Sequence, residues 1–522
     1  MSDKVYIFDT TLRDGQQCPG AGMSFENNLK YAELVSQLKV DIVEAGFPSA
    51  SKLDFEIVKT IAELYASKSS APIVAGLCQL RSEQIDRTIE SLMPAVKLKR
   101  ARLHTYVPVA QELMEASLGE KADKKKIQKD VFEFIKRAVD AGLEVEFSPE
   151  AYSQCGDNFD FVTDLIRAAV EAGVRVINCP DTLGAACSLQ GADYFVNKLN
   201  RHAAIVAKEY PKAQVIWSAH CHNDFGLAVQ NSINAVFDGP CRQIEGCFNG
   251  VGERAGNAAL EAVIMIVKHF SKNIRTDIDT SKIQEVCDFV SAHMLKSQPH
   301  WPVSGDNAAK HSSGGHTNAI LKNPLVYQPF DPKEIGKEIS FLFGPLSGGN
   351  HAKSIIETSG YVCDESEKAP IAQFIKELYK ERRKGITDDE LLKGYFVYRS
   401  PIVPNSINYS RSSNRSEIHF EGKFFEENGE TNSIHEGRDS ALAALKKAVE
   451  KYFPVQVENH RSESKGSGHD AVSMHKILVK TEKGLTYEGD GEDNDIELAA
   501  LKSFIDAVNK AYIEERFRNK TR

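Results

Sequence analysis

Two histidines and a distant aspartate have the types and the spacing of a metal site. His220 and His222 lie two residues apart, just after the apolar run Val215–Ser218. On a strand, residues i and i+2 face the same side, so both imidazoles can reach one ion. An acidic partner, Asp14, follows another apolar run, Val5–Phe8. These side chains predict a three-ligand site with coordination positions left open.

The chemistry of this ligand set indicates which ions and substrates would suit it. Mixed nitrogen and oxygen ligands fit Mn²⁺, Zn²⁺, Co²⁺ or Mg²⁺. The open positions can take a 2-oxo acid through its carboxylate and carbonyl oxygens, and the ion then acts as a Lewis acid on that carbonyl. Arg13, beside Asp14, can stabilise the alkoxide that forms.

Three further polar residues are candidates for contacts with such a substrate. Thr182 can donate a hydrogen bond to the substrate carboxylate. Glu150 and His104 can position the substrate or transfer a proton. Taken singly, Arg13 could instead form a structural salt bridge, and Thr182 could be a turn residue. Neither alternative explains why these residues would share one face of the fold.

These residues are embedded in a repeated pattern of strands and helices. Segments with helical spacing, such as Asn28–Val35 and Asp160–Ala169, alternate with short apolar runs over residues 1–275. Eight such units predict one (β/α)8 barrel. A doubly wound open sheet is less favoured, because no Gly-x-Gly-x-x-Gly follows the first run. The runs are Val5–Phe8, Asp41–Phe47, Pro72–Leu77, Arg100–Tyr106, Leu143–Phe147, Arg175–Cys179, Val215–Ala219 and Arg242–Cys247.

The candidate residues collect at one end of these strands. In a (β/α)8 barrel, the chemistry lies at the C-terminal strand ends. The N-terminal strand ends carry nothing comparable. The residues at or near the C-terminal ends are Arg13, Asp14, Glu44, His104, Glu150, Asp181, Thr182, His220, His222, Asn249, Glu253 and Asn257. Any one of them could be an ordinary hydrogen-bonded side chain without a function. Unrelated side chains, however, would be scattered over the chain and would not collect at one end of the strands.

The chain has 522 residues, which is too long for one compact core. We expect three domains. The barrel spans residues 1–275, and a mostly helical region with loops rich in Gly, Ser and Pro spans 276–400. The third domain spans 401–522.

The third domain contains an internal repeat. Leu442–Lys446 recurs as Leu498–Lys502, and the alternating segments Glu417–Phe425 and Val472–Thr481 upstream of them predict strands. The last ~120 residues therefore predict two strand-strand-helix units. Because they contain no catalytic constellation, a binding or assembly module is the natural interpretation.

Composition excludes several classes of function. The net charge of −9 argues against nucleic acid as the main partner. No apolar run approaches the ~20 residues that span a membrane, and Met1–Val5 leads almost directly into a strand, leaving no room for a signal peptide. Ten cysteines without a Cys-x-x-Cys pair fit reduced thiols and a cytoplasmic location.

Four motifs give the chain a family resemblance. They are Asp9–Gly15 with Gln17, Pro19 and Gly20; Glu44–Pro48; His220–Asp224 with Gly226–Ala228; and Asn249–Leu260. Together they resemble the Claisen-condensing family of 2-isopropylmalate, homocitrate and citramalate synthases. The resemblance implies an acyltransferase that uses acetyl-CoA as co-substrate. The enzyme would condense acetyl-CoA with 2-oxoisovalerate and hydrolyse the thioester, which is the first committed step of leucine biosynthesis.

The resemblance also implies roles for individual residues. The metal, Mn²⁺, Mg²⁺ or Zn²⁺, would be held by Asp14, His220, His222 and Asn257. Residues that contact the oxo acid or act on it would be Arg13, Glu44, His104, Glu150 and Thr182. By the same likeness, His316 is a catalytic histidine that reaches the active site of the partner subunit in a homodimer, and Tyr327 supports it.

The fold implied is thus a TIM barrel, a mostly helical linker region and a C-terminal α+β regulatory domain that dimerises and binds leucine.

Alternatives stay open at this point. Citramalate synthase would use pyruvate, and a methyl-versus-isopropyl preference is worth only a few kcal/mol. Homocitrate synthase is less favoured, because its long acidic substrate needs an extra cation. A barrel lyase of the hydroxymethylglutaryl-CoA lyase type shares the metal motif but lacks the region of His316 and the C-terminal repeat. A non-enzymatic binding protein would have no reason to retain every metal-site residue.

Overall fold

The computed structural model describes residues 3–119, 122–382, 385–413, 415–425, 434–438, 440–465 and 472–519. The chain divides into two compact units. The first comprises Met1–Ala309 with Gln328–Ile339, and the second comprises Lys310–Tyr327 with Ser340–Arg522. The finer division into three domains at residues 275 and 400 stays a prediction.

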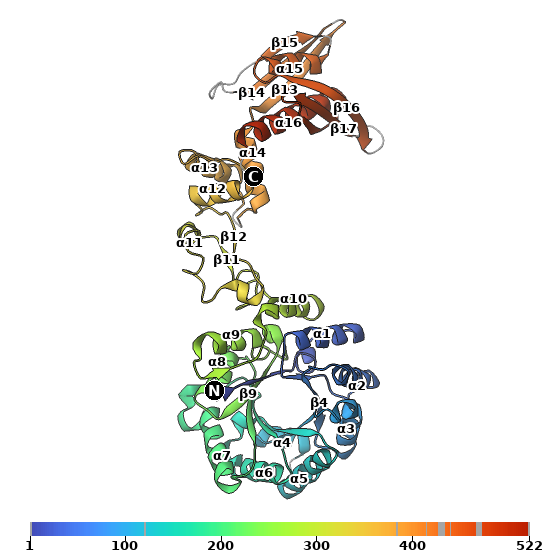
Figure 1. Cartoon of the computed structure of the whole chain (residues 1–522), viewed down its shortest axis with the longest axis vertical. Coiled ribbons are helices and arrows are strands. Elements are labelled where there is room, and N and C mark those ends of the chain that lie inside the picture. The colour runs from blue at the N-terminus through green and yellow to red at the C-terminus, as the bar shows by residue number, and fades with distance from the viewer. Residues whose placement is uncertain are drawn as a thin grey trace. The chain divides into compact units, whose positions relative to one another are not determined.

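In the first unit, eight parallel strands from the described residues close into a barrel (Figure 1). The first strand pairs with both the second and the last, and Tyr6 is the partner of Gln243 at the closure. All eight runs predicted as strands are confirmed. The strands are β2 (Tyr6–Asp9), β3 (Ile42–Glu44), β4 (Ile73–Gln79), β5 (Ala101–Pro108), β6 (Glu144–Glu150), β7 (Val176–Asp181), β8 (Ile216–Cys221) and β9 (Cys241–Gly246).

Helices surround this barrel and cover its outer face. Several begin at residues that satisfy free backbone N–H groups: Ser24 and Ser51 each accept a hydrogen bond from the third residue of the helix that follows. The helices are α1 (Phe25–Gln37), α2 (Lys52–Ala66), α3 (Ser82–Val96), α4 (Gln111–Leu118), α5 (Lys124–Asp140), α6 (Phe159–Glu171), α7 (Phe195–Glu209), α8 (Ala228–Phe237), α9 (Leu260–Phe270) and α10 (Ile283–His293). Two short strands, β1 (Asp3–Lys4) and β10 (Ile274–Arg275), pair beside the barrel.

Alternation along the strands divides apolar from polar side chains. In β5, Leu103 and Val107 belong to the hydrophobic core. Arg102 and His104 lie on the other face of the strand and are also buried. The apolar residues bind the helices to the barrel, and the polar ones line its interior, where the chemistry is placed.

The second unit begins with short elements and a small helical core. Strands β11 (Lys310–His311) and β12 (Ser340–Phe341) pair in parallel. The helices are α11 (Gly314–Ile320), α12 (Gly349–Thr358), α13 (Lys368–Leu378) and α14 (Asp388–Arg399). Thr387 and Glu390 form a reciprocal capping box at the start of α14. The helical character predicted for this region is confirmed.

The C-terminal region confirms the internal repeat but adds strands to it. Each unit has three strands among the described residues, not the two predicted, followed by a helix. The first comprises β13 (Ile402–Ser412), β14 (Arg415–Phe424), β15 (Ile434–Arg438) and α15 (Ala441–Glu450); the second comprises β16 (Val455–Lys465), β17 (Val472–Thr481), β18 (Thr486–Asp493) and α16 (Ile496–Phe517). A register shift interrupts both first strands at matching places, between Pro404 and Ser406 and between Val457 and Asn459.

The helices in the described part of the chain include none that is long and apolar enough to cross a membrane.

Candidate metal centre and active site

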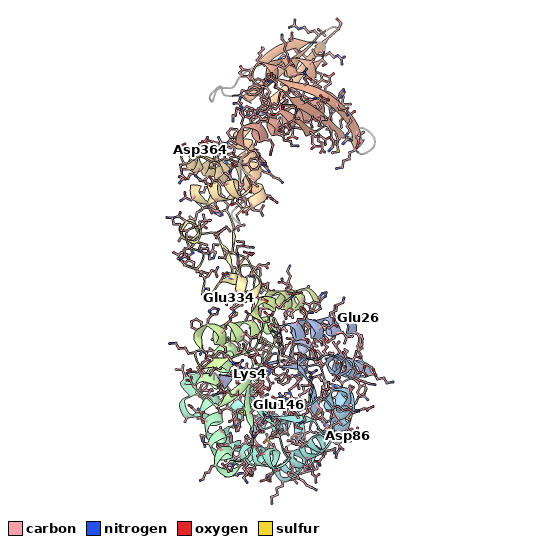
Figure 2. The ribbon with its side chains drawn as sticks, viewed as in Figure 1. Lys4, Glu26, Asp86, Glu146, Glu334 and Asp364 are labelled. Atoms are coloured by element: carbon pink, nitrogen blue, oxygen red, sulfur yellow. The ribbon has the colours of Figure 1, made fainter. Side chains whose placement is uncertain are left out.

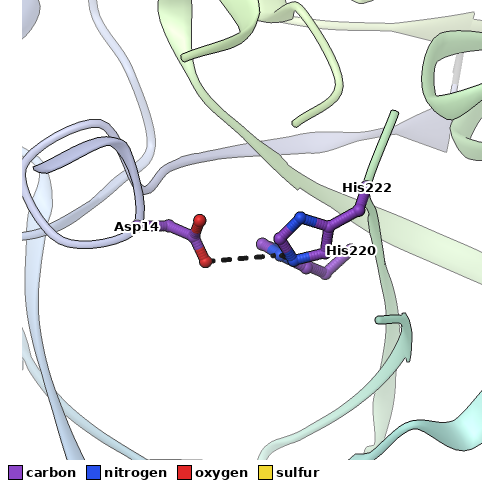
Figure 3. A group of neighbouring side chains, drawn as sticks. All are labelled: Asp14, His220 and His222. Atoms are coloured by element: carbon purple, nitrogen blue, oxygen red, sulfur yellow. Dashed lines mark hydrogen bonds and ion pairs between the residues drawn. The ribbon is translucent and has the colours of Figure 1, made fainter. Parts of the chain in front are cut away.

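Asp14, His220 and His222 meet inside the barrel (Figure 3). Nε2 of His220 lies 3.3 Å from Nε2 of His222 and 3.6 Å from Oδ2 of Asp14. One ligand atom from each residue lies within 4.8 Å of the others, and all three residues are buried. The structure therefore brings together the three side chains that the sequence predicted as metal ligands.

The positions of these ligands follow from the ends of three strands. His220 lies in β8, and His222 follows the end of that strand and forms a β-bridge with Asn257. Asp14 lies in the loop after β2, where Nδ2 of Asn257 donates to its Oδ1 over 2.8 Å. Oδ1 of Asn257 has no hydrogen-bond partner among the described residues. The amide thus ties the loop of Asp14 to the segment after β9.

Electrostatics favours the protonation states that bind metals. Burial lowers the pKa of both His220 and His222 to about 4, so the imidazoles are neutral at physiological pH. Burial also opposes the ionisation of Asp14, but the charge of Arg13, the two histidines and the hydrogen bond from Asn257 together outweigh it and lower the pKa of that carboxyl below its usual value. Neutral imidazoles and an ionised carboxylate are the forms that ligate a metal ion.

The donor set fits a divalent ion. Two neutral Nε2 atoms facing each other at 3.3 Å can make at most one hydrogen bond between them, whereas a cation accepts both lone pairs. Nitrogen and oxygen ligands lie about 2.0–2.2 Å from a Zn²⁺ ion, and donor separations of 3.3 and 3.6 Å allow one ion to reach all three.

Arg13 is held beside the metal ligands by two carboxylates. Its Nη1 donates to Oδ2 of Asp14 and its Nε donates to Oε2 of Glu44, each over 2.5 Å. The other oxygen of Glu44 lies 2.7 Å from Nδ1 of His104, whose Nε2 lies 2.7 Å from Oγ of Ser148. Glu44 is fully buried, and its carboxylate contacts Arg13 and His104. Its direct contact with substrate stays a prediction.

A cavity of about 280 Å³ opens over this group of side chains. Its lining contains nearly all the predicted site residues of the barrel: Arg13, Asp14, His104, Glu150, Thr182, His220 and His222. Burial raises the pKa of Glu150, which favours a proton on its carboxyl. Oγ1 of Thr182 accepts a hydrogen bond from the backbone of Ala151, which leaves its own proton available to a ligand.

Several lining residues were not among the predicted ligand-contacting residues. They are Gln17, Leu77, Tyr106, Ser148, Asn178, Pro180, Glu245, Glu253 and Arg254. The signal for some of them is the period of two along a strand. Tyr106 lies two residues after His104, Ser148 two before Glu150, and Asn178 and Pro180 precede Thr182 at the same spacing. Once one residue of such a strand faces the cavity, its i±2 neighbours do so as well.

Asp181, which the strand-end pattern also highlighted, has a structural role. Its Oδ1 accepts from Ser153 Oγ, and its Oδ2 accepts from the backbone of Ala186. It therefore organises the loops after β6 and β7.

A second group with the composition of a metal site lies inside the barrel. His104, Glu146 and Glu245 have ligand atoms within 4.8 Å of one another. Both nitrogens of His104 are already occupied by Glu44 and Ser148. Glu146 is paired with Arg102 over 3.0 Å. This group is therefore a hydrogen-bonded support for the ligands, and Asp14, His220 and His222 form the better ion site.

His316 and Tyr327 form a pair of their own in the second unit. Their rings stack with centroids 3.9 Å apart and planes 20° apart. Both side chains are exposed, Tyr327 to 47%. His316 lies in the short helix α11, which follows strand β11. The structure thus brings the two predicted residues together, and their catalytic roles stay predictions.

Family models match three consecutive parts of the chain. A model described as HMGL-like matches residues 4–290, and one described as homocitrate synthase post-HMGL domain-like matches residues 303–383. The model of the LeuA allosteric (dimerisation) domain matches residues 423–512.

Curated relatives match almost the whole chain. The 2-isopropylmalate synthase of Aquifex aeolicus is 32% identical over 534 residues, covering 99% of this chain and 98% of that protein. The enzyme of that name from Clostridium kluyveri is 33% identical, with 98% of each chain covered. That of Saccharolobus solfataricus is 35% identical and covers 74% of this chain and 94% of its own. Among solved structures, the Bacillus subtilis HMG-CoA lyase matches 57% of this chain and 96% of its own, with 17% identity and a TM-score of 0.46.

Proposed function

This chain belongs to the 2-isopropylmalate synthase family, and we propose that it condenses acetyl-CoA with 2-oxoisovalerate in a metal-dependent reaction. The observation that supports this most is the similarity to 2-isopropylmalate synthases over 99% of the chain. The convergence of Asp14, His220 and His222 in one cavity supports the need for a metal. The barrel lyase is disfavoured, because the matches to 2-isopropylmalate synthases extend through residues 303–383 and 423–512.

The residues of the cavity suggest how the reaction proceeds. Asp14, His220 and His222 would hold a divalent ion, with Asn257 beside them, and the ion would supply Lewis acidity toward the 2-oxo group of the acid. A general base takes a proton from the methyl group of acetyl-CoA, and the resulting carbanion adds to C2 of the oxo acid. The oxo oxygen becomes an alkoxide and then a hydroxyl group. Water then cleaves the thioester, which releases coenzyme A as a thiol and leaves a new carboxylate.

Three side chains are placed to assist these steps. Arg13 presents its guanidinium next to Asp14 and can stabilise the developing alkoxide. Thr182 can donate its hydroxyl proton to the oxo acid's carboxylate. Glu150, whose pKa is raised by burial, can hold and return a proton near the reacting atoms.

The charges of the cavity favour a monocarboxylic oxo acid over a longer dicarboxylic one. The arginines of the lining are Arg13 and Arg254. Arg13 is paired with Asp14 and Glu44, and Arg254 is paired with Asp224 over 2.9 Å. A second substrate carboxylate would have to compete for a cation that is already engaged, which argues against a homocitrate synthase.

A panel of oxo acids tests this proposal. Purified protein is supplied with Mn²⁺, Mg²⁺ or Zn²⁺ in turn, and thiol release from acetyl-CoA is followed with 2-oxoisovalerate, pyruvate, 2-oxobutyrate and 2-oxoglutarate. We expect the highest kcat/KM with 2-oxoisovalerate. A higher value with pyruvate would reassign the chain to citramalate synthesis, and thiol release that no oxo acid stimulates would refute a condensing enzyme.

The second unit suggests assembly and regulation. The match to the LeuA allosteric (dimerisation) domain supports a homodimer whose last domain binds a small effector, and leucine is the first candidate. Leucine should inhibit the full-length enzyme by a coupling of about 1–3 kcal/mol between the two sites. Steady-state kinetics with increasing leucine measures this coupling, and valine is the matched control. Full activity at saturating leucine would leave the domain as an assembly module.

A further inference from the structure

Glu245 lies beside the ring nitrogen of His220 that does not face the other metal ligands. Its Oε2 is 3.4 Å from Nδ1 of His220, while Nε2 of the same ring is the atom close to Asp14 and His222. Neither Nδ1 of His220 nor Oε2 of Glu245 has a hydrogen-bond partner among the described residues. Two buried, unpaired atoms of complementary type therefore face each other, and a small rotation of either side chain would join them.

The barrel fixes this juxtaposition through its strand register. His220 of β8 and Glu245 of β9 are direct partners in the parallel pairing. Side chains of such partners lie on the same face of a sheet. The other oxygen of Glu245 accepts a hydrogen bond from Ser218 Oγ over 3.2 Å, which anchors the carboxylate. Glu245 is fully buried, so no solvent competes for its free oxygen.

We propose that Glu245 is a positioning residue that accepts a hydrogen bond from Nδ1–H of His220 and so fixes the tautomer whose Nε2 binds the metal. An imidazole that ligates through one nitrogen carries its proton on the other. A carboxylate that accepts this proton orients the ring and increases its basicity. The inference rests on the proposed metal site and concerns one ligand of it. Among the described residues, His220 is the one of the two histidines that has a carboxylate oxygen near its Nδ1, at 3.4 Å.

Metal affinity tests this role without any turnover. Metal-free full-length protein is titrated with Zn²⁺ against a competing chelator for the parent, Glu245→Ala, Glu245→Gln and a matched control, Glu261→Gln. Glu146, inside the barrel (Figure 2), is unsuitable as a control because its carboxyl lies next to that of Glu245. Glu261 in α9 is an equally buried carboxylate, and its partners are the backbone of Asn249, Trp301 and Ser304. The control therefore removes a buried charge without touching a metal ligand.

Loss of an outer carboxylate typically weakens metal binding about 10–100-fold, and we expect this for Glu245→Ala. Glu245→Gln should lose less, because its amide oxygen still accepts a hydrogen bond, and Glu261→Gln should bind Zn²⁺ as the parent does. The melting temperature of the metal-free Glu245 variants should stay near that of the parent, since a positioning role concerns only the loaded site.

Two results would overturn the inference. One is a Glu245→Ala protein that binds Zn²⁺ as tightly as the parent. The other is an equal loss of affinity in Glu261→Gln, or a loss in Glu245→Ala that only follows a lower metal-free melting temperature. Either would indicate general damage to the barrel. A parent that binds Zn²⁺ but condenses no oxo acid would refute the proposed function and leave this inference standing, whereas a parent that binds no Zn²⁺ would refute this inference.

Discussion

The metal centre in the barrel and the His316–Tyr327 pair differ in how fully their own chain surrounds them. Asp14, His220 and His222 are at most 7% exposed, and Asp14 accepts hydrogen bonds from Asn257 and Arg13 of the same barrel. His316 is exposed, and the ring of Tyr327, its stacking partner, is exposed as well. Burial lowers the pKa of His220 and His222 in the metal centre. The side chain of His316 is exposed to water instead.

This difference in burial indicates which of the two sites can function within a single subunit. A buried constellation is preorganised, since its side chains have little rotamer freedom left to lose on binding a ligand. An exposed histidine needs a surface that excludes water and orients it before it can transfer protons efficiently. We therefore expect the barrel site to bind metal and oxo acid by itself, and His316 to depend on a partner.

The largest effect should come from removing the metal. Treatment with a chelator should reduce thiol release to the background rate, because it removes the ion. The substitution His220→Ala should do the same, because one of three protein ligands is lost. Metal content measured by atomic emission and activity should fall together, and added Mn²⁺ or Zn²⁺ should restore only the chelated parent. Full turnover by metal-free His220→Ala would contradict the assignment of the site.

Arg13→Lys should have the next largest effect, a decrease in kcat of about 10²–10³-fold, comparable to the loss of one oxyanion-stabilising donor. A lysine keeps the charge but cannot bond Asp14 and Glu44 at once through a planar fork. The matched control is Arg137→Lys, whose arginine pairs with Asp86 on the surface. Equal kcat values for the two variants would argue against a role for the guanidinium in the reaction.

The exposed pair should be rescued by a second subunit. His316→Ala and His220→Ala proteins, each inactive alone, should recover activity after subunit exchange. Random exchange makes half of the dimers mixed, with one intact site in two, so roughly a quarter of the parental activity is expected. If exchange is proven by mass spectrometry and no activity returns, His316 acts within its own chain or has no catalytic role.

The smallest effect concerns stability away from both sites. His202 is buried between Tyr152 and Thr163, and burial lowers its pKa to about 4. Because this pKa is below the ~6.5 of an unfolded histidine, its stabilising effect is present above pH 6.5 and is lost as the pH falls toward 4, by roughly 3 kcal/mol in all.

In metal-free protein, His202→Gln should therefore reduce the pH dependence of the melting temperature between pH 6.5 and 4. The exposed His300, replaced by Gln, provides the control and should leave that slope unchanged. An unchanged slope in His202→Gln would mean that the histidine titrates normally.

Much of the barrel could be predicted from the sequence because its strands are buried on both faces. Short runs with buried apolar residues then alternate with helical segments at regular intervals, and all eight strands were located. The meeting of Asp14 with His220 followed from the rule that parallel strands of a barrel end at the same face. Glu245 was missed, since a charged residue inside the run Arg242–Cys247 gives no sign of the atom that it will face.

The repeat units show why two strands escaped prediction. β18 has almost no apolar residues, and its buried positions Gly489 and Gly491 are glycines. A Cβ at either would meet the backbone of α16, at Ser503 O and Ala499 O respectively. Glycine therefore stands at the buried positions of β18, because the helix packs closely on the strand. The strand then lacks the alternating apolar side chains from which strands are predicted. β15 is only five residues long and has a single apolar residue, Ile434.

A crystal structure of the protein loaded with Zn²⁺ and 2-oxoisovalerate tests the central claim most directly. The account predicts one anomalous peak about 2.0–2.2 Å from Oδ of Asp14 and from Nε2 of both His220 and His222, with the oxo acid's carboxylate and carbonyl oxygens on the open positions. A peak elsewhere, or an oxo acid bound without the ion, would contradict the account.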